Sequence, residues 1–333
     1  MLNDRLQSGD TLNQDIFLNS SIPFLKKGTV LDEEHITMLQ LFFLLDNESA
    51  APVDTSEKEQ NHQPSDFDKE FTITVKAYEK DFMSWQAGSK VDVFSARKAI
   101  LPLVDLSLSS PEKVFKKLLQ LKEKGYCTDS ICMALLGAIT AAKMQMDRGD
   151  IVQIALAGYL SDCGISQLSH GDRKVDALYK KHPVLSCKML ENASVISQKA
   201  KVAILQHHEL INGSGYPLSI KGDQIHLFGK ILSGSRAVID FFIDENKRND
   251  SNWLMSFENF TRKHLIFYDE AVMKRITIFI MNSLKHSTIV LSNGKIGEIV
   301  FYENDSLSRP LISVNEEIIS LSQRNDLSID YIK

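Results

Sequence analysis

The sequence has little cysteine, no long apolar run and no excess of basic residues. Its four cysteines show no Cys-x-x-Cys spacing, which suits a reducing interior rather than a disulfide framework. The formal net charge of -5 leaves no basic footprint for nucleic acid. No apolar stretch approaches the roughly 20 residues that span a bilayer, and residues 1–4 do not begin a secretory signal. We therefore expect a cytoplasmic protein with no nucleic-acid or membrane partner.

The composition that is present, 43% hydrophobic and 24% charged residues, is typical of two or three globular domains. Residues 1–48 combine short strand signals with a helix expected over 33–45. Asp32 is a good N-cap for that helix, so we expect a small N-terminal α/β domain. Residues 49–70 are rich in Ser, Glu, Gln and Pro and predict a flexible linker.

A helical pattern begins at Phe71 and continues to about residue 285. The pair Ser110-Pro111 predicts a helix start, because serine caps helices and proline suits their first position. Further helices are expected over residues 128–147, 151–160, 175–191, 194–210, 225–243 and 269–284. The helix over 151–160 is apolar nearly all round and should be buried, whereas residues 244–252 predict a charged surface loop. We therefore expect a mainly α domain over residues 71–285.

The periodicity changes after residue 285. Two strands are expected at 288–291 and 295–301, joined by Asn293-Gly294, the strongest short signal for a hairpin turn. Residues 310–314 predict a third strand. Residues 286–333 are therefore expected to form a short β-hairpin tail.

The most informative stretch runs from Gln206 to Pro217. His207 and His208 are adjacent near the end of an apolar helical run, and neutral imidazoles are the commonest metal ligands in proteins. Gly213 and Gly215 follow in a loop and allow the backbone to approach a ligand closely.

This stretch, which continues into Tyr216-Pro217, resembles the HHExxDGxGYP signature of the HD-GYP family, with Asn212 in place of the usual aspartate. The resemblance implies a bacterial signalling protein that hydrolyses cyclic di-GMP at a metal centre inside a helical bundle. The run LKKGTVLDEEHITMLQ is similar to the small accessory domain that often precedes HD-GYP domains, and LSNGxxGxxV to their β tail. We therefore expect an HD-type helical bundle with a small α/β N-terminal domain and a β-hairpin tail.

The resemblance also implies where the metal ligands lie. Four ligand positions are kept in this sequence: Asp162, His182, His207 and His208. Four functional positions differ: Ser130 and Ser161 stand for histidines, Ile165 for a lysine and Arg236 for a bridging aspartate. A serine hydroxyl is a poor ligand beside an imidazole, and an arginine cannot ligate a metal and repels cations.

These departures predict a degenerate site. They imply either no cofactor or one weakly bound divalent metal (iron or manganese by the resemblance), held by Asp162, His182 and one of the paired histidines. Asp162 is the best surviving catalytic candidate. In the alternative interpretation, the four kept residues are buried polar groups that hydrogen-bond one another.

Arg236 offers a second role for the same pocket. Its planar guanidinium matches phosphate oxygens, Tyr216 is available to stack on a base, and the backbone at Gly213 and Gly215 is open to close approach. These residues predict binding of a cyclic dinucleotide without cleavage. The competing hypothesis is an ion pair between Arg236 and Asp162 that closes the pocket.

Three functions follow from these residues. The first is an HD-GYP-type module of cyclic di-GMP signalling that binds nucleotide with little or no hydrolysis. The second is a metal-dependent cyclic di-GMP phosphodiesterase with a reduced metal site. The third is a regulatory scaffold with a protein partner in a signalling pathway.

Overall fold

The structure, a computed structural model, describes residue 7 and residues 9–15, 27–31, 67–248, 253–302, 307–315 and 317–332. The chain divides into two compact units, Met1–Asp66 and Phe67–Lys333. In the first unit, Thr11 and Val30 form an antiparallel bridge. The helix expected over 33–45 and the linker up to residue 66 lie outside the described residues.

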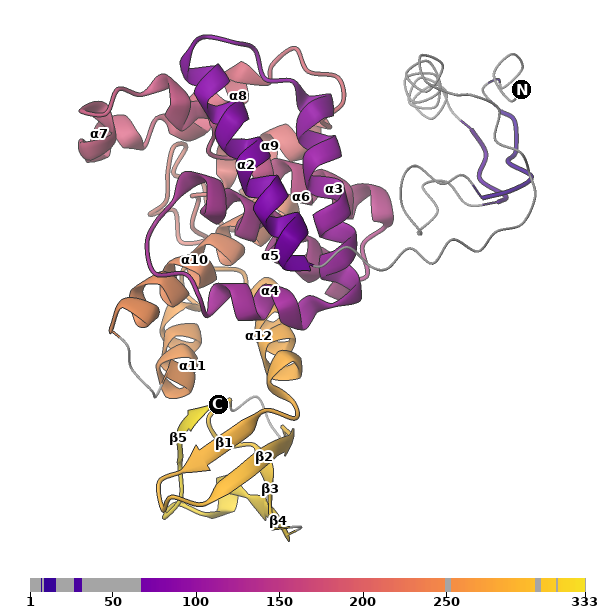
Figure 1. The fold of residues 1–333 in the computed structure, drawn as a ribbon. Coiled ribbons are helices and arrows are strands. Elements are labelled where there is room, and N and C mark those ends of the chain that lie inside the picture. The colour runs from indigo at the N-terminus through magenta and orange to yellow at the C-terminus, as the bar shows by residue number, and fades with distance from the viewer. Residues whose placement is uncertain are drawn as a thin grey trace. The chain divides into compact units, whose positions relative to one another are not determined.

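The second unit is built mainly of helices (Figure 1). The α-helices are α2 (Phe67–Gln86), α3 (Val93–Ser109), α4 (Pro111–Leu118), α5 (Tyr126–Lys143), α6 (Arg148–Leu160), α7 (Asp176–Tyr179), α8 (His182–Met189), α9 (Gln198–Gln206), α10 (Leu227–Arg248), α11 (Trp253–His264) and α12 (Glu270–Leu284). Short 3-10 helices are η1 (Cys163–Gln167), η2 (Asp172–Lys174), η3 (Gly222–Gln224) and η4 (Leu321–Gln323). No described helix combines the length and the apolar character needed to cross a membrane.

Helices α5 and α6 pack against each other in the core, as their nearly continuous apolar sequences require. Gly158 permits their close approach, because a Cβ at this position would lie 2.8 Å from the backbone of Ala134. This contact brings the middle of α5 beside the C-terminal end of α6. Ser130 on α5 and Asp162, two residues after α6, are therefore neighbours in the interior.

Two helix boundaries differ from the expected ones. Helix α2 begins at Phe67, inside the expected linker, because the Phe67 side chain is only 1% exposed and joins the core. Helix α10 continues to Arg248 through half of the expected charged loop. Its last turns are held by Asn246, whose Nδ2 donates to the carbonyl oxygens of Leu118, the last residue of α4, and of Leu121.

Other differences reflect caps and breaks. The helix expected over 175–191 is two helices, α7 and α8, and Pro183 lies in the first turn of α8. Helix α11 was not expected from the sequence. The predicted start of α4 at Ser110-Pro111 is confirmed.

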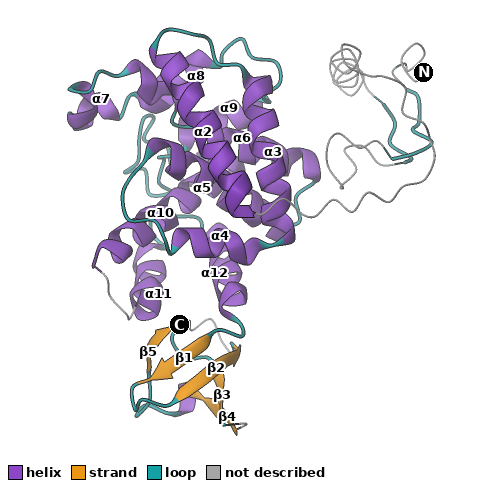
Figure 2. Cartoon of the chain, in the orientation of Figure 1, coloured by secondary structure: helices purple, strands orange, loops and turns teal. Residues whose placement is uncertain are grey.

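The C-terminal region is an antiparallel sheet (Figure 2). Its strands are β1 (Thr288–Leu291), β2 (Ile296–Phe301), β3 (Leu311–Val314), β4 (Glu317–Ser320) and β5 (Ile329–Ile332), in the order β4-β3-β2-β1-β5. The predicted hairpin is confirmed, and Gly294 has the positive φ of 80° that its turn requires. The third strand is confirmed as β3, while β4 and β5 enlarge the expected hairpin tail to a five-stranded sheet.

Candidate metal and ligand site

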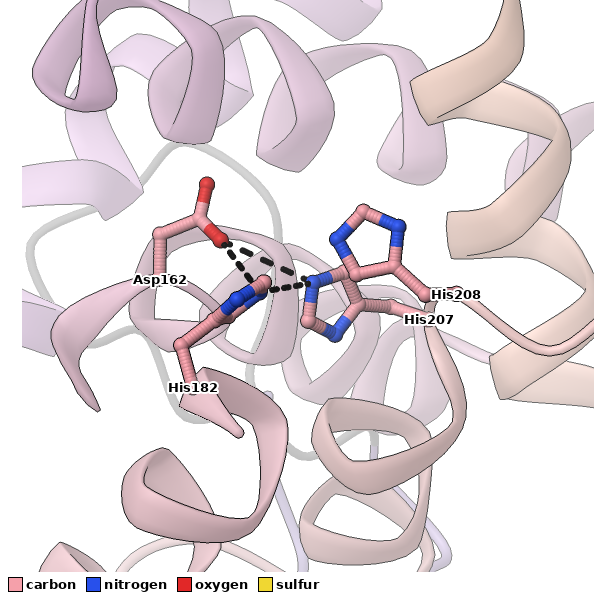
Figure 3. Close-up of side chains that lie close together, drawn as sticks. All are labelled: Asp162, His182, His207 and His208. Atoms are coloured by element: carbon pink, nitrogen blue, oxygen red, sulfur yellow. Dashed lines mark hydrogen bonds and ion pairs between the residues drawn. The ribbon is translucent and has the colours of Figure 1, made fainter. Parts of the chain in front are cut away.

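Four predicted metal ligands converge inside the helical unit. Asp162 lies between α6 and η1, His182 is the first residue of α8, and His207 and His208 follow α9. Each offers one ligand atom, and these four atoms lie within 4.8 Å of one another. Figure 3 shows the four side chains pointing toward one another.

Backbone carbonyl groups fix the tautomers of two of the imidazoles. His182 Nδ1 lies 2.8 Å from the carbonyl oxygen of Tyr179, and His207 Nδ1 lies 2.6 Å from that of Ile204. A carbonyl oxygen only accepts, so each Nδ1 carries the proton and donates it. When such a ring is neutral, its Nε2 atom carries the lone pair that can bind a metal.

These lone pairs meet the carboxylate of Asp162. Its Oδ1 lies 3.2 Å from His182 Nε2 and 3.6 Å from His207 Nε2, and the two nitrogen atoms are 3.2 Å apart. Among the described residues, neither Asp162 Oδ1 nor His208 Nε2 has a hydrogen-bond partner. Atoms with lone pairs that converge in this way repel one another unless a cation or a proton lies between them. These four ligand atoms therefore fit one metal ion.

The protonation states of the cluster also suit a metal. Burial alone would raise the pKa of Asp162, but the neighbouring side chains, the charged Arg236 among them, hold that pKa well below its usual range. Burial lowers the pKa of His207, and it lowers that of His208 further with the help of the neighbouring rings. A charged carboxylate and neutral imidazoles are the forms that bind cations.

Arg236 on α10 borders this cluster and contacts three carboxylates. Its Nη1 lies 3.4 Å from Asp162 Oδ2, and its Nη2 lies 3.6 Å from Asp129 Oδ2. Nε and Nη2 also bind the two oxygens of Asp240, at 3.1 and 3.2 Å. Burial by itself lowers the pKa of Arg236, but the three carboxylates raise it above the ordinary value, so the side chain is a permanent cation.

The two serines at positions where the resemblance predicts histidines make other contacts. Ser161 Oγ donates to the carbonyl oxygen of Gly158 at 2.9 Å, back into its own helix. Ser130 Oγ lies 3.5 Å from Asp162 Oδ2 and 3.2 Å from the hydroxyl of Tyr78. Ile165 is fully buried in the apolar core. None of these side chains adds an imidazole or an amine to the cluster.

The glycine-containing loop folds back over His208. The Tyr216 ring stacks on that of His208, with ring centroids 4.5 Å apart and planes 16° apart. A Cβ on Gly215 would lie 2.5 Å from the carbonyl oxygen of His208, so only glycine permits this approach. Gly213 has a φ of 82° and shapes the turn that precedes it.

Glu209 anchors this loop, a role that the sequence did not reveal. Its buried carboxylate accepts hydrogen bonds from the backbone amides of Leu218, Ser219 and Ile220, at 2.6, 3.1 and 3.2 Å. The acid next to the paired histidines was visible in the sequence, but its partners lie nine to eleven residues away.

A cavity of about 250 Å³ opens beside the cluster. Its lining includes Arg236, Tyr216 and Gly215, three of the four predicted ligand-binding residues, while Gly213 is not part of it. His207 and His208 line the cavity and also belong to the metal cluster. Lys180 also lines the cavity, with its Nζ 5.6 Å from the centroid of the Tyr216 ring.

Comparison with known proteins points to one family. Residues 113–241 match the HD domain family. The cyclic di-GMP phosphodiesterase PdeB of Borreliella burgdorferi is 22% identical to the chain over 153 residues, which cover 45% of this chain and 40% of that protein. The chain thus spans less than half the length of this relative.

A solved structure shares the fold. Bd1817, an HDG"Y"P protein from Bdellovibrio bacteriovorus, superposes with a TM-score of 0.50 at 16% sequence identity. The match covers 81% of this chain and 95% of the other. At this level of identity the similarity supports the helical architecture and carries no assignment of ligands.

Proposed function

From its HD domain, through which this chain belongs to the HD-GYP family, we propose that it is a cytoplasmic protein of cyclic di-GMP signalling that binds the nucleotide with little or no hydrolysis. The observation that carries this proposal is the position of Arg236. Its guanidinium lies among Asp129, Asp162 and Asp240, directly beside the candidate metal ligands.

A fixed guanidinium at this position opposes a two-metal centre. In such centres, two cations stabilise both the attacking and the leaving oxygen of the phosphoryl group. Arg236 repels a second cation, and it already neutralises the carboxylate oxygen Asp162 Oδ2 that would face one. The chain therefore keeps the charge of a second cation but not its open coordination positions.

One divalent cation still fits the other side of Asp162. Asp162 Oδ1 and the Nε2 atoms of His182 and His207 would hold it, and the buried, unpartnered Nε2 atom of His208 is the fourth candidate ligand among the described residues. When bound, such a cation supplies Lewis-acid polarisation of a phosphate oxygen or of water. The carbonyl groups of Tyr179 and Ile204 accept the Nδ1 protons and so aim the two Nε2 atoms at it.

The cavity provides the nucleotide contacts in this proposal. Tyr216 offers a ring face, and Lys180 and Arg236 offer positive charge to a phosphate. Arg236 would release Asp240, the most exposed of its three partners at 34%, and keep the two buried ones. A volume of about 250 Å³ is at the lower limit of small-molecule sites, so only part of a dinucleotide would enter it.

The second candidate function is hydrolysis with a reduced metal site. It is favoured by the three polar atoms, Asp162 Oδ1 and the Nε2 atoms of His182 and His207, that converge on one point. A single metal held by Asp162 and the imidazoles would then have to act without a second cation. Turnover of cyclic di-GMP to pGpG in the presence of added metal separates this function from binding alone.

Titration calorimetry on metal-free protein tests the proposal. We expect cyclic di-GMP to bind in the micromolar range, near -8 kcal/mol. Lys180→Ala should weaken binding, whereas the neighbouring and exposed Lys181→Ala should leave it unchanged. Arg236→Ala should lose at least about 1.5 kcal/mol of affinity, as expected for a charge-assisted hydrogen bond. Absence of binding by the parent protein, or rapid conversion to pGpG, would contradict the proposal.

A further inference from the structure

Ser130 links a tyrosine on α2 to the carboxylate of the candidate metal site. Its hydroxyl oxygen lies 3.2 Å from Tyr78 Oη and 3.5 Å from Asp162 Oδ2, and all three side chains are buried. Asp162 is ionised beside Arg236 and can only accept hydrogen bonds, so Ser130 donates to it. Ser130 in turn accepts from the phenol of Tyr78. The two hydrogen bonds therefore point in one direction, from Tyr78 through Ser130 to Asp162.

These hydrogen bonds give the two oxygens of Asp162 different partners. Oδ2 is held by the Arg236 guanidinium and the Ser130 hydroxyl, on the side away from the imidazoles. Oδ1 is left to face His182 Nε2 and His207 Nε2. With Oδ2 fixed by two donors, the carboxylate presents one oxygen to a cation rather than rotating freely.

We infer that Tyr78 and Ser130 are positioning residues, which act through Asp162 to set the affinity of the site for a divalent cation. This inference rests on the proposed cation site. Neither residue touches the cation; each fixes a ligand from behind, and such outer partners change metal affinity by roughly 10–100-fold when removed. Because the Ser130–Asp162 contact is at the outer limit of a hydrogen bond, the expected effect is at the lower end of that range.

The same contact ties α2 to the site. Helix α2 is the first element of the helical unit, and it also accepts a hydrogen bond from Gln167 Nε2 at the carbonyl oxygen of Trp85. Gln167 ends η1, the short helix that begins directly after Asp162. Two independent contacts therefore join α2 to the segment that carries the carboxylate.

Tyr159 provides a matched control. Its ring lies 4.8 Å from that of Tyr78 in an edge-to-face arrangement, and it is equally buried. Within the described part of the chain, its hydroxyl has no hydrogen-bond partner. Tyr159→Phe therefore removes the same atom from the same aromatic cluster without touching the route to Asp162.

The test is calorimetric titration of the full chain with Zn²⁺ after chelator treatment. Zn²⁺ suits a site of imidazoles and one carboxylate. Tyr78→Phe and Ser130→Ala should each raise the Kd about tenfold. The double variant should bind Zn²⁺ no more weakly than the Ser130→Ala variant, because loss of the Ser130 hydroxyl alone already disconnects Tyr78 from Asp162. Tyr159→Phe should bind like the parent.

The other possible results distinguish failure of the positioning role from failure of the cation site itself. If the parent binds Zn²⁺ and Tyr78→Phe binds as the Tyr159→Phe control does, the positioning role is wrong while the cation site stands. If the parent binds no Zn²⁺, the cation site is wrong and the positioning role is wrong with it. Should Tyr78→Phe fail to fold, Ser130→Ala alone decides, since it leaves the aromatic cluster intact; unchanged affinity in that variant overturns the inference.

Discussion

The two oxygens of the buried Asp162 carboxylate have different neighbours: imidazoles face Oδ1, and a guanidinium faces Oδ2. On the imidazole side, Oδ1 faces the Nε2 atoms of His182 and His207 and has no hydrogen-bond partner among the described residues. On the arginine side, Oδ2 meets a guanidinium that belongs to the chain itself. One side thus offers ligand atoms to a metal ion, and the other already pairs with a fixed cation of the protein.

The difference bears on how this polar interior stays stable when no metal is bound. Asp129 and Asp162 are buried, and each would be costly to ionise alone. Arg236 contacts both, and its remaining partner Asp240 also pairs with Lys124 at 3.0 Å. The arginine side therefore contributes to folding in every state of the protein, whereas the imidazole side contributes most when a ligand is bound.

Removing the fixed cation should have the largest effect. Arg236→Met keeps most of the side-chain volume but leaves two buried carboxylates without their cation. We expect a loss of about 3–5 kcal/mol in the free energy of unfolding, as found when one partner of a buried ion pair is removed. Chemical denaturation measures it. Arg324→Met, which breaks a fully exposed pair with Asp326, is the control and should leave stability unchanged. Equal stabilities for the two variants would remove the distinction between the two sides.

Lowering the pH should reduce the stability that the buried imidazoles contribute to the fold. Burial holds the pKa of His207 and His208 below the ordinary value of about 6.5, so the unfolded chain binds these protons first. The stability due to these neutral rings is fully present above about pH 6.5 and is lost as the pH falls.

The arginine side should partly offset this loss. Burial raises the pKa of Asp129 to about 6, so the folded state takes up one proton in the same range. The net decline between pH 7 and 5 is then close to one proton, or at most about 1.4 kcal/mol per pH unit. Denaturation of metal-free protein at several pH values measures it, and Asp129→Asn should steepen the decline. A profile that is flat from pH 7 to 5 would speak against neutral buried imidazoles.

The smallest change in stability is expected from His182→Asn in metal-free protein. An asparagine amide can replace the Nδ1 donor to Tyr179 and removes only the Nε2 lone pair. We expect less than about 1 kcal/mol of destabilisation, while His182→Ala should lose about 1–3 kcal/mol because the carbonyl group is left unpaired.

Added metal should then raise the melting temperature of the parent but not of His182→Asn, because only the parent binds it. Thermal melts with and without Zn²⁺ measure both effects. Equal shifts for parent and variant would show that His182 serves the fold alone.

Local signals in the sequence predicted the parts of the fold that depend on local chemistry. The Asn293-Gly294 turn and the start at Ser110-Pro111 are examples, since their residues favour those conformations wherever they occur. The end of α10 could not be predicted in this way. Asn246 looks like a loop residue until its carbonyl partners, more than 120 positions earlier in the chain, are known.

The candidate site shows the same division. The resemblance to a motif predicted the four metal-cluster residues, and the structure brings them together. The ion pair between Arg236 and Asp162 was one of two hypotheses. Asp240 could have been identified as a further partner of Arg236, because charges four residues apart meet on a helix. Asp129 could not, because only the packing of α5 against α10 brings it within reach.

The number of metal ions retained by each chain tests the central claim most directly. The full chain would be loaded with Mn²⁺ or Fe²⁺, freed of unbound metal and subjected to elemental analysis. Since Arg236 fills the arginine side and Asp162, His182, His207 and His208 form one cluster, the account predicts at most one ion per chain. The His182→Asn variant should retain less than the parent. Two tightly held ions per chain would contradict the account.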